Sequence, residues 1–148
     1  TKESASIIRT SKAPLVNFSE LEPLLSPKND TTYLFNFWAT WCKPCVEELP
    51  FFEELYKEKA GEPFKMYLIS LDFPKQIEKK LIPFMDKHQL TGEVMVINDP
   101  DANTWIDKVS PEWSGAIPAT LIVRGDQRTF HEGKLSSKEE IENLISQL

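Results

Sequence analysis

Two cysteines separated by two residues, Cys42 and Cys45, are the residues of this chain best suited to chemistry, and the chain has no others. A pair at this spacing can form a structural disulfide, supply half of a metal site, or cycle between dithiol and disulfide. A zinc site normally takes four cysteine or histidine ligands, but His88 and His131 lie in separate segments far along the chain. A disulfide across two intervening residues removes little entropy from the unfolded chain. The spacing therefore favours a working redox pair.

The segments on either side of the cysteines predict how they are positioned. The aromatic and apolar run 32–38 predicts a strand buried in the middle of a sheet. After Cys45, apolar residues recur at intervals of three and four, which predicts a helix that runs to about Gly61. Cys42 then lies at the N-terminus of that helix, where free N–H groups and the helix dipole favour a thiolate. We therefore expect Cys42 to be the attacking sulfur.

Cys45 and the two residues between the cysteines are expected to support this attack. Cys45 lies one turn deeper, where it can attack a mixed disulfide formed on Cys42 and release the product. Lys43 places a positive charge beside the nucleophile, which favours its anion. Pro44 lacks an N–H group at a place where the first helical turn has donors to spare. The sequence thus predicts Cys42 and Cys45 as catalytic residues, and Lys43 and Pro44 as residues that tune the redox pair.

Hydrophobic spacing in the rest of the chain predicts alternating strands and helices. In chain order we expect a short helix with a capping box at Ser19 and Glu22, a strand at 64–71, an amphipathic helical stretch at 75–89, a strand at 93–99, a helix at 100–109 that opens near Pro100, a hairpin of 119–123 with 128–133, and a C-terminal helix that starts at Ser136 or Ser137. Pro50 and Pro83 fall inside two of these helices, so each should kink or split its helix. Residues 1–12 are small and polar, which predicts a loose arm. With no repeat or linker, 1–148 is predicted to be a single α/β domain, a mixed sheet with helices on both faces.

The composition limits the classes of function. With 148 residues, of which 41% are hydrophobic, the chain can bury an ordinary core, which argues against disorder. The formal charge of −6 leaves no basic surplus for phosphates, which argues against nucleic acid as a partner. No apolar run approaches the roughly 20 residues that span a bilayer. The sequence opens at Thr1 without a Met or a signal-peptide pattern, so a removed segment or a membrane tether ahead of it stays open.

The stretch FWATWCKPC, residues 37–45, resembles the active-site segment of the thioredoxin superfamily, in particular its TlpA/ResA-like branch of extracytoplasmic thiol-disulfide oxidoreductases. Other marks of that branch follow in order along the chain. Pro50 resembles the proline that kinks the first long helix, residues 73–91 resemble the helical insertion of the branch, and GAIPATLIV, residues 115–123, resembles the cis-proline loop. The N-terminal part departs from the branch, because it lacks the Gly-containing β-hairpin that often opens it.

The resemblance implies a thioredoxin-like three-layer fold and a protein-disulfide oxidoreductase that needs no metal and no dissociable cofactor. It implies protein thiols and disulfides as substrates and an upstream thiol protein as the electron donor. It also implies a reductant in the bacterial periplasm, or anchored to a membrane and facing it, and we expect a monomer. Two other functions stay open. One is a redox-gated protein-binding module with the same fold, and the other is a thiol peroxidase, although we find no Thr-containing loop of the kind that presents the nucleophile in that class.

The resemblance also implies site residues outside the cysteine pair. Pro118 is expected to follow a cis peptide bond and to leave the Ile117 backbone free to pair with an extended substrate segment. Glu48 matches a glutamate near the thiols that accepts a proton or tunes their pKa, and the alternative is an ordinary helix-surface glutamate. Asn36 stands where thioredoxin has a buried aspartate, and the alternative is a core asparagine bonded to backbone groups. Trp41 is expected to line the exposed surface around the nucleophile, where substrate binds.

Four further aromatic and imidazole side chains have simpler expected roles. Trp38 belongs to the predicted buried strand and is expected in the core. Trp113 precedes the proline loop, where it either borders the substrate groove or packs in the interior. His88 continues an apolar stripe and His131 lies in the last predicted strand, so both are expected to be half-buried and satisfied rather than catalytic.

Overall fold

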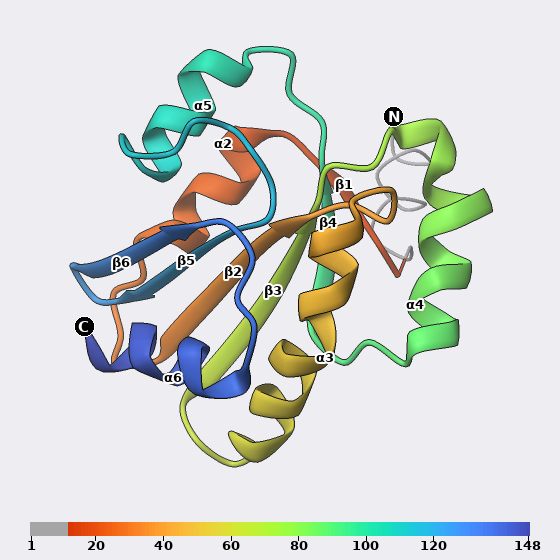
Figure 1. Cartoon of the computed structure of the whole chain (residues 1–148). Coiled ribbons are helices and arrows are strands. Elements are labelled where there is room, and N and C mark those ends of the chain that lie inside the picture. Colours follow the sequence, from red (N-terminus) through yellow and green to blue (C-terminus); the bar gives the residue numbers. More distant parts are fainter. Residues whose placement is uncertain (1–11) are drawn as a thin grey trace.

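The computed structural model describes residues 12–148, so the predicted arm at 1–12 lies outside the described residues apart from Lys12 (Figure 1). The strands are β1 (Leu15–Val16), β2 (Thr32–Trp38), β3 (Phe64–Ser70), β4 (Glu93–Ile97), β5 (Ala119–Arg124) and β6 (Gln127–Glu132). They form one sheet in the order β1-β4-β3-β2-β5-β6. The first four of these neighbours pair in parallel, whereas β5 is antiparallel to β2 and β6 is antiparallel to β5. The predicted mixed sheet is therefore confirmed.

Helices cover both faces of this sheet, which confirms the predicted three layers (Figure 1). They are α2 (Phe18–Leu21), α3 (Lys43–Glu58), α4 (Ile82–His88), α5 (Ala102–Val109) and α6 (Lys138–Ser146). Side chains of α3, α4 and α6 pack in one hydrophobic cluster against the sheet, and those of α2 and α5 pack in a second cluster on the opposite face. Each helix thus buries one apolar stripe against the sheet and leaves its other side to solvent.

The centre of the sheet is β2, as its aromatic and apolar sequence predicts. Successive side chains of a strand point to opposite faces. Leu34 and Trp38 accordingly join the cluster beneath α3 and α6, while Phe35 and Phe37 join the cluster beneath α2 and α5. Because both faces of β2 are buried, apolar residues fill consecutive positions of the strand rather than alternate ones, with Thr32 and Asn36 as the polar exceptions. This strand fixes where the cysteine loop begins.

The segment between β3 and β4 is split, as the proline within it predicts. It consists of a 3₁₀ turn at Pro74–Gln76, a π-helical turn at Ile77–Leu81 and then α4. Pro83 lies in the first turn of α4 and lacks an N–H group, so it interrupts the helical hydrogen bonds where the π-helical turn passes into α4. Leu81 is buried, and Phe84 packs against the core cluster beneath α3. The insertion is thereby held against the helix that carries the cysteines.

The capping box of the first helix differs from the prediction. The Asn17 side chain accepts from the Glu20 N–H group at 3.0 Å, and the Glu20 carboxylate accepts from the Asn17 N–H group at 3.2 Å. The predicted pair, Ser19 and Glu22, is therefore wrong by two residues. The helix begins at Phe18, which is buried against the sheet, and this burial sets where the cap must lie.

Other element ends agree with the sequence to within a few residues. The N-cap of α6 is Ser137, one of the two predicted serines. The helix α5 begins at Ala102, two residues later than predicted, so Pro100 lies just before its N-cap Asp101. The strand β1 was not predicted, because two residues are too short to carry a hydrophobic pattern. Within residues 12–148, no helix combines the length and the apolar character needed to cross a membrane.

Candidate active site

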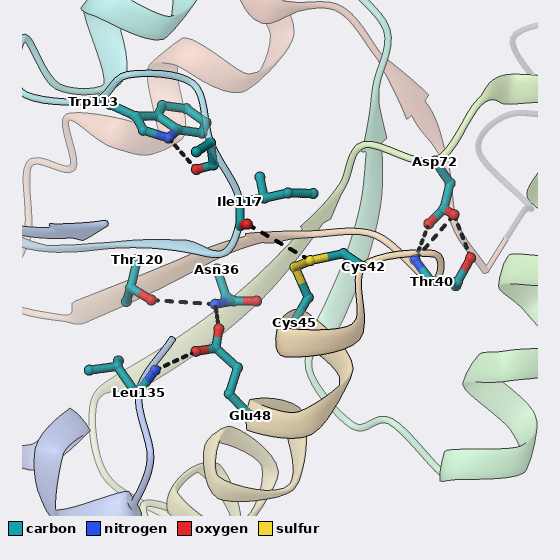
Figure 2. The surroundings of a disulfide bond; sticks show 11 residues. Asn36, Thr40, Cys42, Cys45, Glu48, Asp72, Trp113, Ile117, Thr120 and Leu135 are labelled. Atoms are coloured by element: carbon teal, nitrogen blue, oxygen red, sulfur yellow. Dashed lines mark hydrogen bonds between the residues drawn. A yellow bond between two sulfur atoms is a disulfide. The ribbon is translucent and has the colours of Figure 1, made fainter. Parts of the chain in front are cut away.

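The two cysteines form a disulfide at the N-terminus of α3, with their Cα atoms 5.3 Å apart (Figure 2). After β2 ends at Trp38, the chain turns at once, and the Cys42 N–H group donates to the Ala39 carbonyl at 3.1 Å. Cys42 is the N-cap of α3, and its carbonyl accepts the first helical hydrogen bond from the Val46 N–H group at 3.0 Å. The central strand therefore delivers Cys42 to a helix N-terminus, as predicted.

The two cysteines differ in their exposure to solvent. Cys42 is 6% exposed, whereas Cys45, in the first turn of α3, is 0% exposed. Lys43 and Pro44 are both exposed between them. An incoming molecule can therefore reach the disulfide only at the Cys42 side. Within residues 12–148, no group of three or more His, Cys, Asp or Glu side chains is arranged to hold a metal ion.

The loop before β5 lies against the outer cysteine (Figure 2). The peptide bond between Ile117 and Pro118 is cis, as the resemblance implies. The Ile117 carbonyl oxygen lies 3.9 Å from Cys42 Sγ, so in the reduced protein a Cys42 thiol would donate weakly to that carbonyl. The structure thus brings together Cys42, Cys45, Ile117 and Pro118. That an extended substrate pairs with Ile117 stays a prediction.

Glu48 lies one turn beyond Cys45 on α3 and is fully buried, so the alternative of a helix-surface glutamate is wrong. Its carboxylate accepts from the Asn36 side-chain amide and from the Leu135 N–H group, each at 2.8 Å (Figure 2). Burial raises the pKa of Glu48 from 4.5 to about 7, against the lowering effect of these two donors and of the nearby Lys134 charge. The site therefore contains a carboxyl group that can hold or release a proton near neutral pH.

Asn36 connects Glu48 to the neighbouring strand. Its Nδ2 donates to Glu48 Oε2 at 2.8 Å and to Thr120 Oγ1 at 3.3 Å, and Thr120 is its register partner on β5. The alternative of an asparagine held by backbone groups is therefore wrong. Thr120 was not predicted as a site residue, although a hydroxyl inside the apolar run 119–123 is a signal, because a buried polar group needs a partner.

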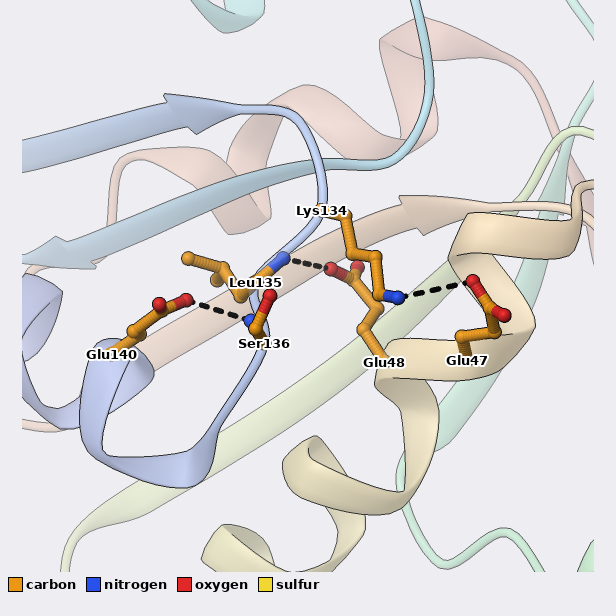
Figure 3. Close-up of polar contacts among 6 residues, drawn as sticks. All are labelled: Glu47, Glu48, Lys134, Leu135, Ser136 and Glu140. Atoms are coloured by element: carbon orange, nitrogen blue, oxygen red, sulfur yellow. Dashed lines mark hydrogen bonds and ion pairs between the residues drawn. The ribbon is translucent and has the colours of Figure 1, made fainter.

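The loop after β6 completes the burial of Glu48 (Figure 3). Besides the bond from Leu135, Lys134 forms an ion pair with Glu47 at 3.0 Å, and the Ser136 N–H group donates to Glu140 at 2.7 Å. These bonds hold the loop across the first turns of α3 and against the start of α6. A segment almost ninety residues along the chain therefore seals the inner side of the site, and no local pattern around Glu48 could predict this.

A second polar network holds the loop that leads into Cys42 (Figure 2). Asp72, which follows β3, is 2% exposed and accepts from the Thr40 N–H group at 3.1 Å. It also accepts from the hydroxyls of Thr40 and Ser70, at 2.5 and 2.6 Å. Asp72 was not predicted as a site residue, because the sequence after β3 indicates only that a strand has ended. Since Thr40 lies two residues before Cys42, this network fixes the approach to the nucleophile.

We expect Asp72→Asn to lower the free energy of unfolding by about 2 kcal/mol, measured by urea denaturation. The amide nitrogen cannot accept a hydrogen bond, so at least one of the Thr40 and Ser70 donors loses its partner in a buried site. Asp126→Asn is the matched control, since Asp126 is exposed in the β5–β6 turn and should change stability by less than about 0.5 kcal/mol. Equal effects of the two substitutions would contradict this role of Asp72.

The structure tests the predicted positions of three tryptophans. Trp38 is fully buried and Trp41 is 60% exposed, as expected. Trp113 is buried, its Nε1 donates to the Ala116 carbonyl at 2.8 Å, and its ring lies 4.7 Å from that of Phe37, so it packs in the interior.

The two histidines also differ from each other. His131 is half-buried, as expected. The prediction for His88 is wrong, because it is exposed, with its ring 4.1 Å from that of Phe84. The reason is that the apolar stripe of α4 ends one turn earlier, so His88 in the last turn lies beyond the buried side of the helix.

The sequence of this chain is similar to those of known proteins. The model of the AhpC/TSA family matches residues 18–128. Thioredoxin-like protein YneN of Bacillus subtilis is 34% identical over an alignment of 110 residues that covers 72% of this chain and 59% of YneN. The thiol-disulfide oxidoreductase ResA of Geobacillus kaustophilus is 26% identical over 152 aligned residues, which cover 99% of this chain and 81% of that protein. The chain thus spans less than two thirds of YneN.

Solved structures confirm the predicted thioredoxin-like fold. A thioredoxin-related protein from Neisseria meningitidis serogroup B superposes with a TM-score of 0.67 at 21% identity, over 84% of this chain and 88% of that one. StoA from Bacillus subtilis superposes with a TM-score of 0.60 at 19% identity, over 80% of this chain and 85% of that one. At these identities the likeness concerns the fold alone.

Proposed function

The chain belongs to the AhpC/TSA family of thioredoxin-like proteins, and from this premise we propose that it is a thiol-disulfide oxidoreductase that reduces disulfides of polypeptides. One observation carries the proposal: the only two cysteines form a disulfide at a helix N-terminus, and only Cys42 reaches solvent. ResA of Geobacillus kaustophilus and the sporulation thiol-disulfide oxidoreductase A of Bacillus subtilis carry this activity in their names. Both support the same chemistry for this chain.

The proposed cycle starts from the reduced pair. The Cys42 thiolate attacks one sulfur of a substrate disulfide, which breaks the substrate S–S bond, forms a mixed disulfide and releases one substrate thiolate. Cys45 then loses its proton and attacks the Cys42 sulfur. This closes the Cys42–Cys45 disulfide and releases the second substrate thiolate, so two electrons have passed to the substrate. An upstream dithiol protein restores the reduced pair by the reverse exchange.

The structure suggests how the protein favours each step. Free N–H groups at the start of α3 and the helix dipole stabilise the Cys42 thiolate, so it forms before substrate arrives. Cys45 is buried directly beneath and cannot be attacked by a second substrate molecule. We assign to Glu48, one turn away on the same helix, the role of taking up the Cys45 proton, because its pKa of about 7 allows it to be ionised at neutral pH.

The proposal extends to partners and location. Trp41, Ile117 and Pro118 surround the exposed side of Cys42 and are assigned to substrate contact. The resemblance to the TlpA/ResA-like branch supports an extracytoplasmic site of action in a bacterium, protein thiols as partners on both sides of the cycle, and a monomer. A disulfide reductant is useful in such a compartment because disulfides form and persist there.

Insulin reduction tests the proposed activity. With dithiothreitol as electron source, catalytic amounts of the protein should reduce insulin at least about tenfold faster than dithiothreitol alone, because a helix-stabilised thiolate reacts faster than a free thiol. Consumption of hydrogen peroxide in the same buffer should not exceed that of dithiothreitol. Insulin reduction at the background rate would contradict the proposal in favour of a redox-gated binding module. Rapid loss of peroxide would instead favour a thiol peroxidase.

A further inference from the structure

A groove opens beside the disulfide, between the loop that precedes Cys42 and the helical insertion. It has a volume of about 350 Å³ and is lined by Thr40, Trp41, Lys80, Pro83, Phe84 and Lys87. Trp41 is the residue directly before the nucleophile. A molecule that occupies this groove therefore lies next to the only side from which the disulfide can be reached. The proposed thiol-disulfide exchange involves no residue of the helical insertion.

The apolar part of the groove wall is formed by Trp41, Pro83 and Phe84. Among residues 12–148, the exposed large hydrophobic side chains are Trp41 and Phe73, at 60% and 63%. They lie in two neighbouring loops, which the bonds from Thr40 to Asp72 hold together. Phe73 lies in a separate pocket with Pro74 and Trp105, so the apolar surface next to Cys42 consists of the exposed Trp41 together with Pro83 and Phe84 of the groove.

The charges of the groove are all positive. Lys80 and Lys87 line it, and no carboxylate does. Within residues 12–148 neither lysine forms an ion pair, whereas Lys12, Lys65 and Lys134 each hold a carboxylate at 2.9 to 3.0 Å. The chain as a whole carries a charge of −6, but at physiological salt charges more than about 8 Å apart are largely screened. A bound segment therefore responds to these two lysines rather than to the net charge.

We propose that this groove binds an acidic, apolar segment of the polypeptide whose disulfide reacts with Cys42. An apolar side chain of that segment packs between Trp41 and Phe84, and carboxylates beside it pair with Lys80 and Lys87. The proposal rests on the proposed function and deepens it, because it names the chemistry of the preferred substrate. The helical insertion thereby selects the substrate, while Ile117 and Pro118 contact it on the opposite side of the nucleophile.

Three peptides that differ only in charge test this proposal. Each holds one cysteine as a mixed disulfide with 2-mercaptoethanol and a leucine next to two Asp, two Asn or two Lys residues. With the reduced protein at a physiological ionic strength of about 0.15 M, where the net charge is screened, we expect the Asp peptide to react at least about fivefold faster than the Asn peptide and the Lys peptide to react slowest. The preference should shrink as salt is added. Equal rates for the three peptides would overturn the proposed role of the groove in substrate selection but would not contradict the oxidoreductase activity.

Charge reversals locate the preference. K80E/K87E should reverse the order of the three peptides. K28E/K57E changes the net charge equally, and among residues 12–148 neither of these exposed lysines forms an ion pair. Lys28 precedes β2 and Lys57 lies in the last turn of α3, roughly 20 Å of strand or helix away from Cys42, so this variant should keep the order. Reaction with 2-hydroxyethyl disulfide, which is small and neutral, should change less than twofold in both variants. An equal loss of rate on every disulfide in K80E/K87E would overturn the proposal, and no exchange with any peptide by the wild-type protein would overturn the proposed function as well.

Discussion

Replacing Cys42 with serine should abolish insulin reduction, leaving only the rate of dithiothreitol, because the attacking thiolate is gone and a serine hydroxyl stays protonated at neutral pH. Replacing Cys45 with serine should also stop turnover, but at a later step. The Cys42 thiolate still attacks, and without a second thiol the mixed disulfide persists. Once dithiothreitol has been removed, the reduced Cys45→Ser protein should therefore accumulate covalent complexes with oxidised substrate, seen by non-reducing electrophoresis and mass spectrometry, and added dithiothreitol should reduce them.

The two variants control for each other, because both lose the same cross-link in the folded protein. Any loss of stability that follows from breaking the disulfide is therefore common to both, and only the chemistry differs. The difference in exposure predicts which variant traps substrate, since Cys42 is 6% exposed and Cys45 is sealed beneath it. Trapping by Cys42→Ser instead would reverse the assignment of nucleophile. Turnover by both variants at the wild-type rate would exclude the redox pair altogether.

The parts of the fold that the sequence predicts well are those that depend on local patterns. The buried strand β2 follows from seven consecutive residues that suit burial on both faces, and the start of α3 follows from the spacing after Cys45. Cys42 becomes the N-cap because the strand and the helix follow each other directly along the chain. The redox pair, its helix and the loop with Pro118 could therefore be placed without knowledge of the tertiary structure, the last of them through the resemblance.

The hydrogen-bond partners of the polar residues in the site lie far apart in the chain, and the sequence did not predict them. Glu48 has the local pattern of a glutamate in the first turns of a helix, which suits an exposed position equally well. Its burial comes from Leu135, 87 positions away, and from Asn36 on the central strand. Asp72 likewise acquires its role only when Thr40, 32 positions away, lies beside it. Such contacts leave no periodic signal in the sequence, which is why the two polar networks around the cysteines appeared only with the structure.

The burial of Glu48 has a consequence for stability that can be measured as a function of pH. Its pKa is about 7 in the folded protein, against its usual value of 4.5 in the unfolded chain. The folded state therefore binds a proton more tightly than the unfolded state. The stability that this proton contributes is fully present below about pH 4.5, falls as the pH rises toward 7 and is lost above it. The difference between the two pKa values corresponds to about 3 kcal/mol.

We expect Glu48→Gln to remove this pH dependence. In the oxidised protein, the free energy of unfolding of the variant minus that of the wild type should rise by about 3 kcal/mol between pH 4 and pH 8, measured by urea denaturation. The glutamine has a constant cost, because its amide nitrogen cannot accept from Asn36 Nδ2. The Asn36 side-chain oxygen has no hydrogen-bond partner among residues 12–148. If the Asn36 amide rotates so that this oxygen accepts from the glutamine, the Asn36 nitrogen loses its own partners instead. That cost does not change with pH, so the slope reports Glu48 alone.

Glu47→Gln is the matched control, since Glu47 precedes Glu48 in the same turn of α3 and experiences the same helix dipole but is exposed. Its ion pair with Lys134 is on the surface, where such pairs contribute less than about 1 kcal/mol. The stability difference of this variant should therefore change little between pH 4 and pH 8. A flat difference for Glu48→Gln as well would mean that water reaches the carboxylate. A difference that falls with rising pH would mean that the bonds from Asn36 and Leu135 outweigh burial, and Glu48 would then be ionised throughout and unable to hold a proton near neutral pH.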